Sequence, residues 1–292
     1  MVLTNSCREK SEQLQLLDSK TLEFPSASAI EFYQDKLYVL GDDAPYLLVL
    51  DTDYRPLDSF RYIDTDTDRL PKDTKPDIES CFIFSSGKQW NLLAIGSMSA
   101  DNRFNNFIFS LSHRNHVEAY PIFSSHISFP LITQINIEGS AMVNGTMIFA
   151  NRATDVTKRN HLLIRHKNDS ITVIPVQLES EKDIIGISGL YYLAIKDILF
   201  FTGSVESTSD PLVDGPIGES YFGWIGNFSK KMNSQEIAPD RLMKLSAVHK
   251  EFSGHKIESV CVEQTSNEII FHLVADNDDG SSKIFKLGGF GK

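Results

Sequence analysis

The chain has 292 residues, of which 41% are hydrophobic and 23% are charged. These values are ordinary for a folded globular protein and exclude a disordered one. Its 39 Asp and Glu residues outnumber its 28 Lys and Arg residues, which gives a formal net charge of -11. A surface that neutralises the phosphates of nucleic acid or of anionic lipid needs the opposite sign. We therefore expect neither nucleic acid nor a membrane as a partner.

The three cysteines, Cys7, Cys81 and Cys261, lack the number and spacing of a disulfide framework or of a zinc site. We expect them to be reduced. The N-terminal stretch lacks the apolar segment of a signal peptide, and no run of about 18 apolar residues occurs elsewhere. These features predict a cytoplasmic protein, or a secreted one whose leader has been removed.

Along the chain, the apolar residues form short runs separated by turn clusters such as Asn144-Gly145, a pattern that predicts many short strands. A first strand is expected around Leu14 to Leu17. Five similar segments follow, and each reads as strand, tight turn, strand. They are SAIEFYQDKLYVLGDD from Ser28, ESCFIFSSGKQWNLLAIGS from Glu79, EGSAMVNGTMIFANR from Glu138, SGLYYLAIKDILFFTGS from Ser188 and ESVCVEQTSNEIIFHLVAD from Glu258.

Each hairpin is followed by apolar material for two more strands, for example residues 46–50 and 57–62 after the first. Four strands per repeat make the blade of a propeller. The sequence therefore predicts an all-β, five-bladed propeller that spans residues 1–292 as one domain. Because the chain after Glu258 suffices for only three strands, the N-terminal strand is predicted to complete the last blade and to close the ring.

The first strand of each blade lines the propeller axis, so equivalent positions at its start are expected to converge in the channel. These positions are Ser28, Glu79, Glu138, Ser188 and Glu258. Like charges gathered away from water require a counter-charge, and neither of the two remaining ring positions holds Lys or Arg. A negatively charged set of oxygen ligands suits Ca²⁺ better than Mg²⁺. We predict a calcium site formed by this ring; the alternative is a hydrated channel lining without an ion.

The ends of the second strands are expected to emerge at a mouth of the channel, where loops carry function. Asp42, Asp43 and Arg152 lie at such ends. Arg152 is a candidate to clamp an anionic group through two hydrogen bonds, and Asp42 or Asp43 is a candidate to orient water or to act as a base. The alternative is that these residues serve as turn formers and as a solvated cation.

The order Ser, Glu, Glu, Ser, Glu at the starts of the blades resembles the ring of the calcium-activated nucleotidase (apyrase) family, a five-bladed propeller that holds calcium in its channel. The likeness lies in SAIEFYQDKLY around Ser28, in the glutamates that open the second and third blades, in GISGLYY around Ser188 and in KIESV around Glu258. It implies hydrolysis of nucleoside di- and triphosphates, with the mouth residues of the family matched by Asp42, Asp43 and Arg152.

The chain departs from the pattern of that family at its positive charges. The family has a lysine just before its second-blade glutamate and a tryptophan just after it, where this chain reads Pro76-Asp77-Ile78-Glu79-Ser80. Val205 stands where the family has a lysine in the fourth blade. We therefore expect little positive charge for a polyphosphate at the mouth. The chain is also similar to uncharacterised bacterial propellers distantly related to phytase-like and gluconolactonase-like proteins.

These observations lead to two functional hypotheses. The first is a monomeric, calcium-dependent hydrolase of a phosphoric ester or anhydride, acting on a small anionic substrate. The alternative is a non-catalytic propeller in which the ion fastens the blades while the surface binds a protein or a small ligand. A lactonase ranks lower, because it would need Asn and Asp ligands more than this glutamate-rich ring.

Overall fold

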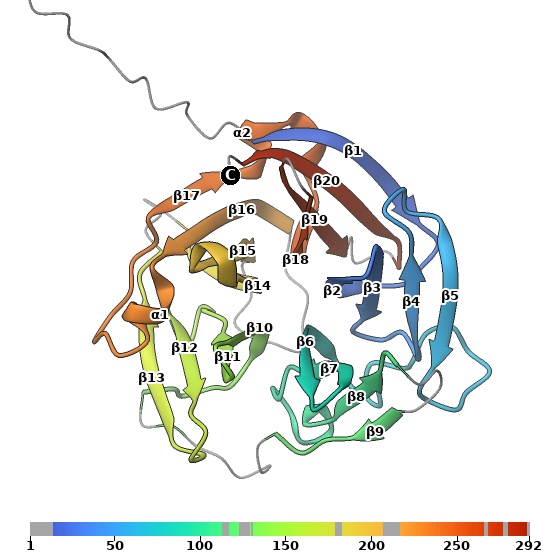
Figure 1. Cartoon of the computed structure of the whole chain (residues 1–292), viewed down its shortest axis with the longest axis horizontal. Coiled ribbons are helices and arrows are strands. Elements are labelled where there is room, and N and C mark those ends of the chain that lie inside the picture. Colours follow the sequence, from blue (N-terminus) through green and yellow to red (C-terminus); the bar gives the residue numbers. More distant parts are fainter. Residues whose placement is uncertain are drawn as a thin grey trace, which may run out of the picture.

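The computed structural model describes residues 14–112, 117–122, 129, 131–178, 183–206, 217–265, 268–276 and 280–290. It contains five four-stranded antiparallel sheets that surround a central axis as the blades of a propeller (Figure 1). The predicted all-β, five-bladed architecture is confirmed.

Within each of the first four blades, the strands are arranged in chain order from the axis to the outer edge. Blade 1 contains β2 (Ala27–Tyr33), β3 (Lys36–Gly41), β4 (Tyr46–Leu50) and β5 (Pro56–Arg61), and blade 2 contains β6 (Ile78–Ser86), β7 (Gln89–Gly96), β8 (Asn106–Ser110) and β9 (Val117–Ala119). Blade 3 contains β10 (Ile137–Val143), β11 (Thr146–Asn151), β12 (Asn160–Arg165) and β13 (Ile171–Val176). Blade 4 contains β14 (Ile185–Leu193), β15 (Ile198–Glu206), β16 (Ile217–Gly226) and β17 (Arg241–Lys244). Blade 5 contains β18 (Lys256–Gln264), β19 (Ile269–Asp276), β20 (Ser282–Phe290) and β1 (Gln15–Leu22).

Helical structure in the described residues is confined to single turns between strands. These are η1 (Asp101–Arg103), η2 (Ala194–Lys196), α1 (Phe228–Lys231), α2 (Leu245–Val248) and η3 (Lys250–Phe252). Within the described part of the chain, no helix has both the length and the apolar composition needed to cross a membrane.

The N-terminal strand closes the ring as predicted. β1 pairs antiparallel with β20, from Gln15 opposite Gly288 to Leu22 opposite Ser282. The strand is longer than the apolar pattern suggested, because it forms the outer edge of its blade and most of its residues are exposed. Polar residues at such an edge do not weaken the pairing, so hydrophobicity alone marks only its beginning.

The hydrophobic core lies between the blades rather than on the axis. Five clusters of buried side chains occur, one at each junction of neighbouring blades. Between blades 4 and 5, for example, the Phe271 ring packs edge-on against Phe200 and Phe222, with centroid separations of 4.8 and 5.0 Å. Because both faces of every sheet are occupied in this way, the inner strands can present polar residues to the channel.

A β-bulge marks the same place in every blade. The register between the first and second strands shifts on either side of one residue of the inner strand, which lies opposite no partner. These five residues are Ser28, Glu79, Glu138, Ser188 and Glu258. A bulge removes a residue from the ladder and redirects its side chain. The five positions aligned from the sequence are therefore structurally equivalent.

Candidate functional site

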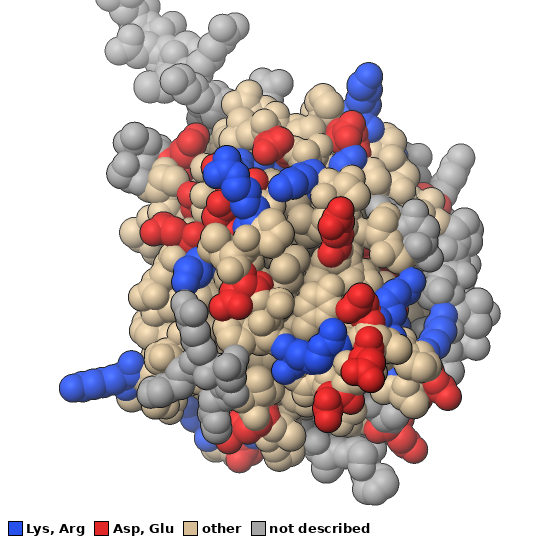
Figure 2. All heavy atoms as spheres, turned by 90° about the vertical axis from the view of Figure 1, so that its right-hand side faces the viewer, with Lys and Arg blue, Asp and Glu red and all other residues tan. Residues whose placement is uncertain are grey.

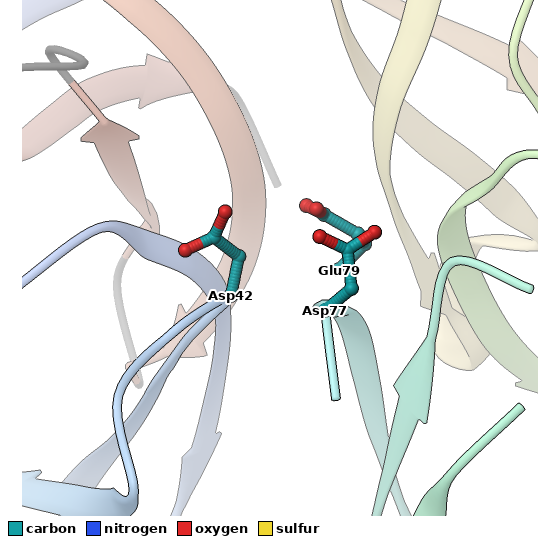
Figure 3. A group of neighbouring side chains, drawn as sticks. All are labelled: Asp42, Asp77 and Glu79. Carbon is teal, nitrogen blue, oxygen red and sulfur yellow. The ribbon is translucent and has the colours of Figure 1, made fainter. Parts of the chain in front are cut away.

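An acidic cluster lies where blades 1 and 2 meet at the bulge end of the channel. It consists of Asp42, Asp77 and Glu79, and one carboxylate oxygen from each lies within 4.8 Å of the others (Figure 3). Asp42 follows β3, whereas Asp77 directly precedes β6 and Glu79 is its bulge residue. Asp77 adopts a left-handed backbone conformation with φ of 57°, which Asp tolerates better than most residues.

Two cationic side chains reach into the acidic cluster. The ammonium of Lys75 forms an ion pair with Asp42 and lies 2.8 Å from Asp77 Oδ1. Arg103 Nη1 lies 2.8 Å from Asp77 Oδ2, which also accepts a hydrogen bond of 2.5 Å from Ser97 Oγ. Among the described residues, none gives Glu79 an ion pair or a hydrogen bond. Glu79 is therefore the carboxyl group of the cluster to which the described residues give no direct partner.

Burial and like charges disfavour the ionised forms of this cluster. Burial raises the pKa of Glu79 well above its usual range, and the negative charges of Glu138 and Asp77 raise it further. Burial also raises the pKa of Asp42 to about 6, although the charge of Lys75 opposes this effect. A cation bound between the carboxylates would favour their ionised forms. The cluster thus has the charge and the oxygen donors that a divalent cation requires.

The remaining two glutamates of the ring share one guanidinium. Arg152 Nη1 lies 3.2 Å from Glu138 Oε2 and 3.9 Å from Glu258 Oε2, and Arg152 Nη2 donates to Ser204 Oγ at 2.9 Å. Glu138 also accepts a hydrogen bond from Asn136. The Arg152 side chain is 4% exposed. It is therefore held inside the site rather than at the surface.

Glu258 has an incompletely satisfied carboxylate. Its Oε1 lies 2.9 Å from Lys256 Nζ, whereas its Oε2 is buried and has no hydrogen-bond partner among the described residues. Burial raises the pKa of Glu258 to about 7, and Lys256 offsets only part of this rise. An unpartnered buried carboxylate oxygen is costly unless a ligand approaches it.

The expectation of little positive charge at the mouth was wrong. Lys75, Arg103, Arg152 and Lys256 all make ion pairs with the carboxylates described above. The residue before Glu79 is not a lysine, but Lys75, four positions before Glu79, places its ammonium at Asp42 and Asp77. The ring glutamates are thus partly compensated by the chain itself.

A sequence signal for several of these partners existed. Asp77, Asn136 and Lys256 each stand two residues before a ring glutamate. In extended chain, residues i and i+2 point to the same side. A search of the positions two before the ring would have placed Asn136 and Lys256 beside their glutamates, whereas Asp77, whose backbone is left-handed rather than extended, lies outside this rule.

The predicted mouth residues lie at this end of the channel, but they are engaged within the protein. Asp43 is 6% exposed, and its Oδ2 lies 2.7 Å from Arg69 Nη2. The Oδ1 atoms of Asp42 and Asp43 are buried and have no hydrogen-bond partner in the described part of the chain. The catalytic roles of Asp42, Asp43 and Arg152 stay predictions.

The two ring serines join neighbouring blades. Ser28 Oγ donates to the carbonyl oxygen of Ile78, and Ser188 Oγ donates to that of Ile257 at 2.6 Å. Each acceptor is the residue just before a ring glutamate. The serines thereby fix the strand that presents the carboxylate of the next blade; their role as metal ligands stays a prediction.

Ser188→Ala is expected to lower the free energy of unfolding by about 1–3 kcal/mol, because it leaves the buried Ile257 carbonyl without its donor. Denaturant unfolding measures this change. Ser140→Ala is the matched control, since the Ser140 hydroxyl is equally buried but has no partner among the described residues; its removal should be neutral or stabilising. Equal destabilisation by both substitutions would contradict the assigned role.

The outer surface differs from this buried site in its charge arrangement. On the side of the propeller that carries β4 and β5, acidic and basic side chains are intermingled (Figure 2). The exposed pair of Arg55 and Asp53, 3.3 Å apart, is one example. Breaking such an exposed pair costs little stability, whereas removing one partner of a buried pair in the channel leaves an uncompensated buried charge.

Comparison with known proteins identifies the family of this chain. Residues 23–288 match the model of a family described as "Family of unknown function (DUF6929)". The chain belongs to this family. No curated protein matches it.

Solved structures similar to this DUF6929 chain share its fold. Glutaminyl cyclase of Myxococcus xanthus is 12% identical, with 94% of this chain and 95% of that chain covered and a TM-score of 0.50. A luciferin-regenerating enzyme is 9% identical, with 94% and 96% covered and a TM-score of 0.53. A mutant α-L-arabinanase from Cellvibrio cellulosa is 11% identical, with 92% of each chain covered and a TM-score of 0.51. At these identities the likeness concerns the fold alone.

Proposed function

We propose that the acidic cluster of this DUF6929 protein binds Ca²⁺ and that the site hydrolyses a phosphoric ester or anhydride. The observation that carries the proposal is the convergence of Asp42, Asp77 and Glu79, with one oxygen of each within 4.8 Å of the others. Oxygen atoms about 2.3–2.6 Å from a common centre can have such separations. The buried Glu79 carboxyl, which has no direct partner among the described residues, supports a cation at this place, because a bound cation would favour its ionised form.

The arrangement of the chain suits a small anionic substrate. Lys75 and Arg152 place positive charge on two sides of the carboxylates. A bound calcium ion would contribute Lewis-acid stabilisation of the charge that develops on phosphoryl oxygens. Asp42 and Asp43 would orient the attacking water through their unpartnered Oδ1 atoms. Arg152 would donate to the leaving phosphate if its pairing with Glu138 loosened.

A second candidate function is a non-catalytic propeller with a structural ion. One observation favours it, namely that Arg152 and Asp43 are almost fully buried and already paired with Glu138 and Arg69. In that case the ion would fasten blades 1 and 2 together, and a ligand or protein would bind elsewhere on the surface.

Release of inorganic phosphate from nucleoside di- and triphosphates and from simple phosphate monoesters distinguishes the two functions. We expect turnover with Ca²⁺, little with Mg²⁺, and none after chelation. Glu79→Gln is expected to reduce turnover by about a hundredfold or more, because the site loses one charged ligand. A protein that calcium stabilises but that releases no phosphate would overturn the hydrolase and favour the structural ion.

A further inference from the structure

A cavity, called the second cavity below, lies at the opposite end of the channel from the acidic cluster. The inner strands start at the bulge residues, so their later halves, which line this cavity, reach the other end of the axis. The cavity has a volume of about 500 Å³ and is lined by residues of all five blades. This volume suits a small organic ligand.

Aromatic side chains form much of the wall of this second cavity. Tyr33, Trp90, Tyr191 and Tyr192 line it together with Phe82. The rings of Tyr33 and Trp90 lie 5.3 Å apart, centroid to centroid, and the side chain of Trp90 is 42% exposed. The wall is therefore rich in aromatic rings and includes an exposed tryptophan.

A single buried carboxyl group belongs to the same lining. Glu31 is 7% exposed, and its Oε1 accepts a hydrogen bond of 3.0 Å from the backbone N–H of Phe32. Among the described residues that line the cavity there is no Lys or Arg. Burial raises the pKa of Glu31 to about 8, and the N–H groups of Phe32 and Ile83 offset only part of this rise. Glu31 thus has no cationic side chain beside it in the described lining of the cavity.

A second polar group of the lining also lacks a partner. Ser140 is 1% exposed, lines the cavity, and its hydroxyl makes no hydrogen bond among the described residues. Buried hydroxyl groups in folded proteins are normally paired. Glu31 and Ser140 together therefore point to a ligand that carries both a positive charge and a hydrogen-bonding group.

We propose that this cavity binds a small organic cation of the ammonium class. Its positive charge would lie against the aromatic faces and near Glu31, since ring faces and carboxylates both attract cations. Its polar substituent would hydrogen-bond to Ser140. A cation beside Glu31 would favour the ionised form of its carboxyl group, whereas an anion would oppose that ionisation and a neutral apolar ligand would gain nothing from it.

Calorimetric titration with choline tests the proposal, with 3,3-dimethylbutan-1-ol as the neutral compound of the same shape. We expect choline to bind, and we expect the affinity for the neutral compound to be lower by a factor of about ten or more. Glu31→Gln and Trp90→Ala are each expected to weaken choline binding about tenfold. Asp53→Asn, which removes an exposed carboxylate from the turn between β4 and β5, should leave choline binding unchanged.

Fluorescence locates the bound cation, because the chain has only two tryptophans. In Trp224→Phe, which keeps an aromatic ring in the cluster around Phe200, choline should still change the emission of Trp90.

Three outcomes would overturn the proposal. They are the absence of binding by choline, tetramethylammonium and benzyltrimethylammonium at about 10 mM, equal affinity for choline and its neutral counterpart, and binding that Trp90→Ala does not weaken. Since Trp90 is partly exposed, its replacement decides the question even if Glu31→Gln fails to fold.

Discussion

Asp77→Ala is expected to lower the free energy of unfolding by about 3–5 kcal/mol, because it leaves the buried Arg103 without its carboxylate and the buried Lys75 with Asp42 alone. The side chains of Lys75 and Arg103 are 10% and 5% exposed, and each lies 2.8 Å from an oxygen of Asp77. The substitution also removes the acceptor of the Ser97 hydroxyl. Urea unfolding in the presence of a chelator measures this structural effect without a contribution from bound metal.

Asp53→Ala provides the matched control for Asp77→Ala. Asp53 also pairs with a cation, Arg55, but the two side chains are 64% and 71% exposed. Breaking an exposed pair changes stability by about 1 kcal/mol or less. If Asp77→Ala were no more destabilising than Asp53→Ala, the buried network around Asp77 would not hold blades 1 and 2 as described.

The unfolding free energy of the metal-free protein is expected to fall as the pH rises from about 5 to 8. The folded-state pKa of Glu258 is raised to about 7 from an ordinary value of 4.5. Between these values the folded state keeps a proton that the unfolded state has lost, so the contribution is present below about 4.5 and is lost as the pH rises through 7. At about 1.4 kcal/mol per pKa unit, the loss is on the order of 3 kcal/mol. The pKa of Asp42 is also raised, to about 6, so this group likewise makes the unfolding free energy fall as the pH rises.

Glu258→Gln isolates the contribution of that group to the pH dependence. Urea unfolding of the chelated protein at several pH values should show a fall smaller by roughly 3 kcal/mol in this variant. Glu268→Gln, which changes an exposed glutamate, should keep the slope of the wild type. Parallel profiles for Glu258→Gln and the wild type would show that Glu258 is not protonated in the folded state.

The blades could be predicted from the sequence because their signal is local and repeated. Five strand-turn-strand segments share a position that the structure shows as a β-bulge, for example Ser28 in blade 1 and Glu138 in blade 3. The closing strand was found from a count of missing strands. Only its beginning was marked by hydrophobicity, since an outer edge exposes residues such as Lys20.

The partners of the ring glutamates depend on geometry that strand periodicity does not contain. Lys75 and Arg103 lie in the segments around β6 and β7, and they reach Asp77 because these connections fold over the same end of the channel. Asp77 itself adopts a left-handed conformation just before a strand. By contrast, Lys256 could have been found, because its i,i+2 relation to Glu258 places both on one side of β18.

Glu31 shows the limit of reasoning by repeat equivalence. It lies three residues beyond the ring serine, so the alignment of the blades gives it no carboxylate counterpart; the matching positions hold Phe82, Ala141, Tyr191 and Cys261. Its burial and its aromatic surroundings become visible only when the later halves of the inner strands are assembled around the axis. A residue that breaks a repeat can therefore indicate a second site.

Calorimetric titration of Ca²⁺ into chelator-treated protein tests the central claim, that the acidic cluster at the bulge end of the channel binds a divalent cation. We expect binding by the wild type, at least about tenfold weaker binding by Glu79→Gln, and unchanged binding by the exposed control Glu268→Gln. Absence of calcium binding by the wild type, or equal affinity in Glu79→Gln, would contradict the account.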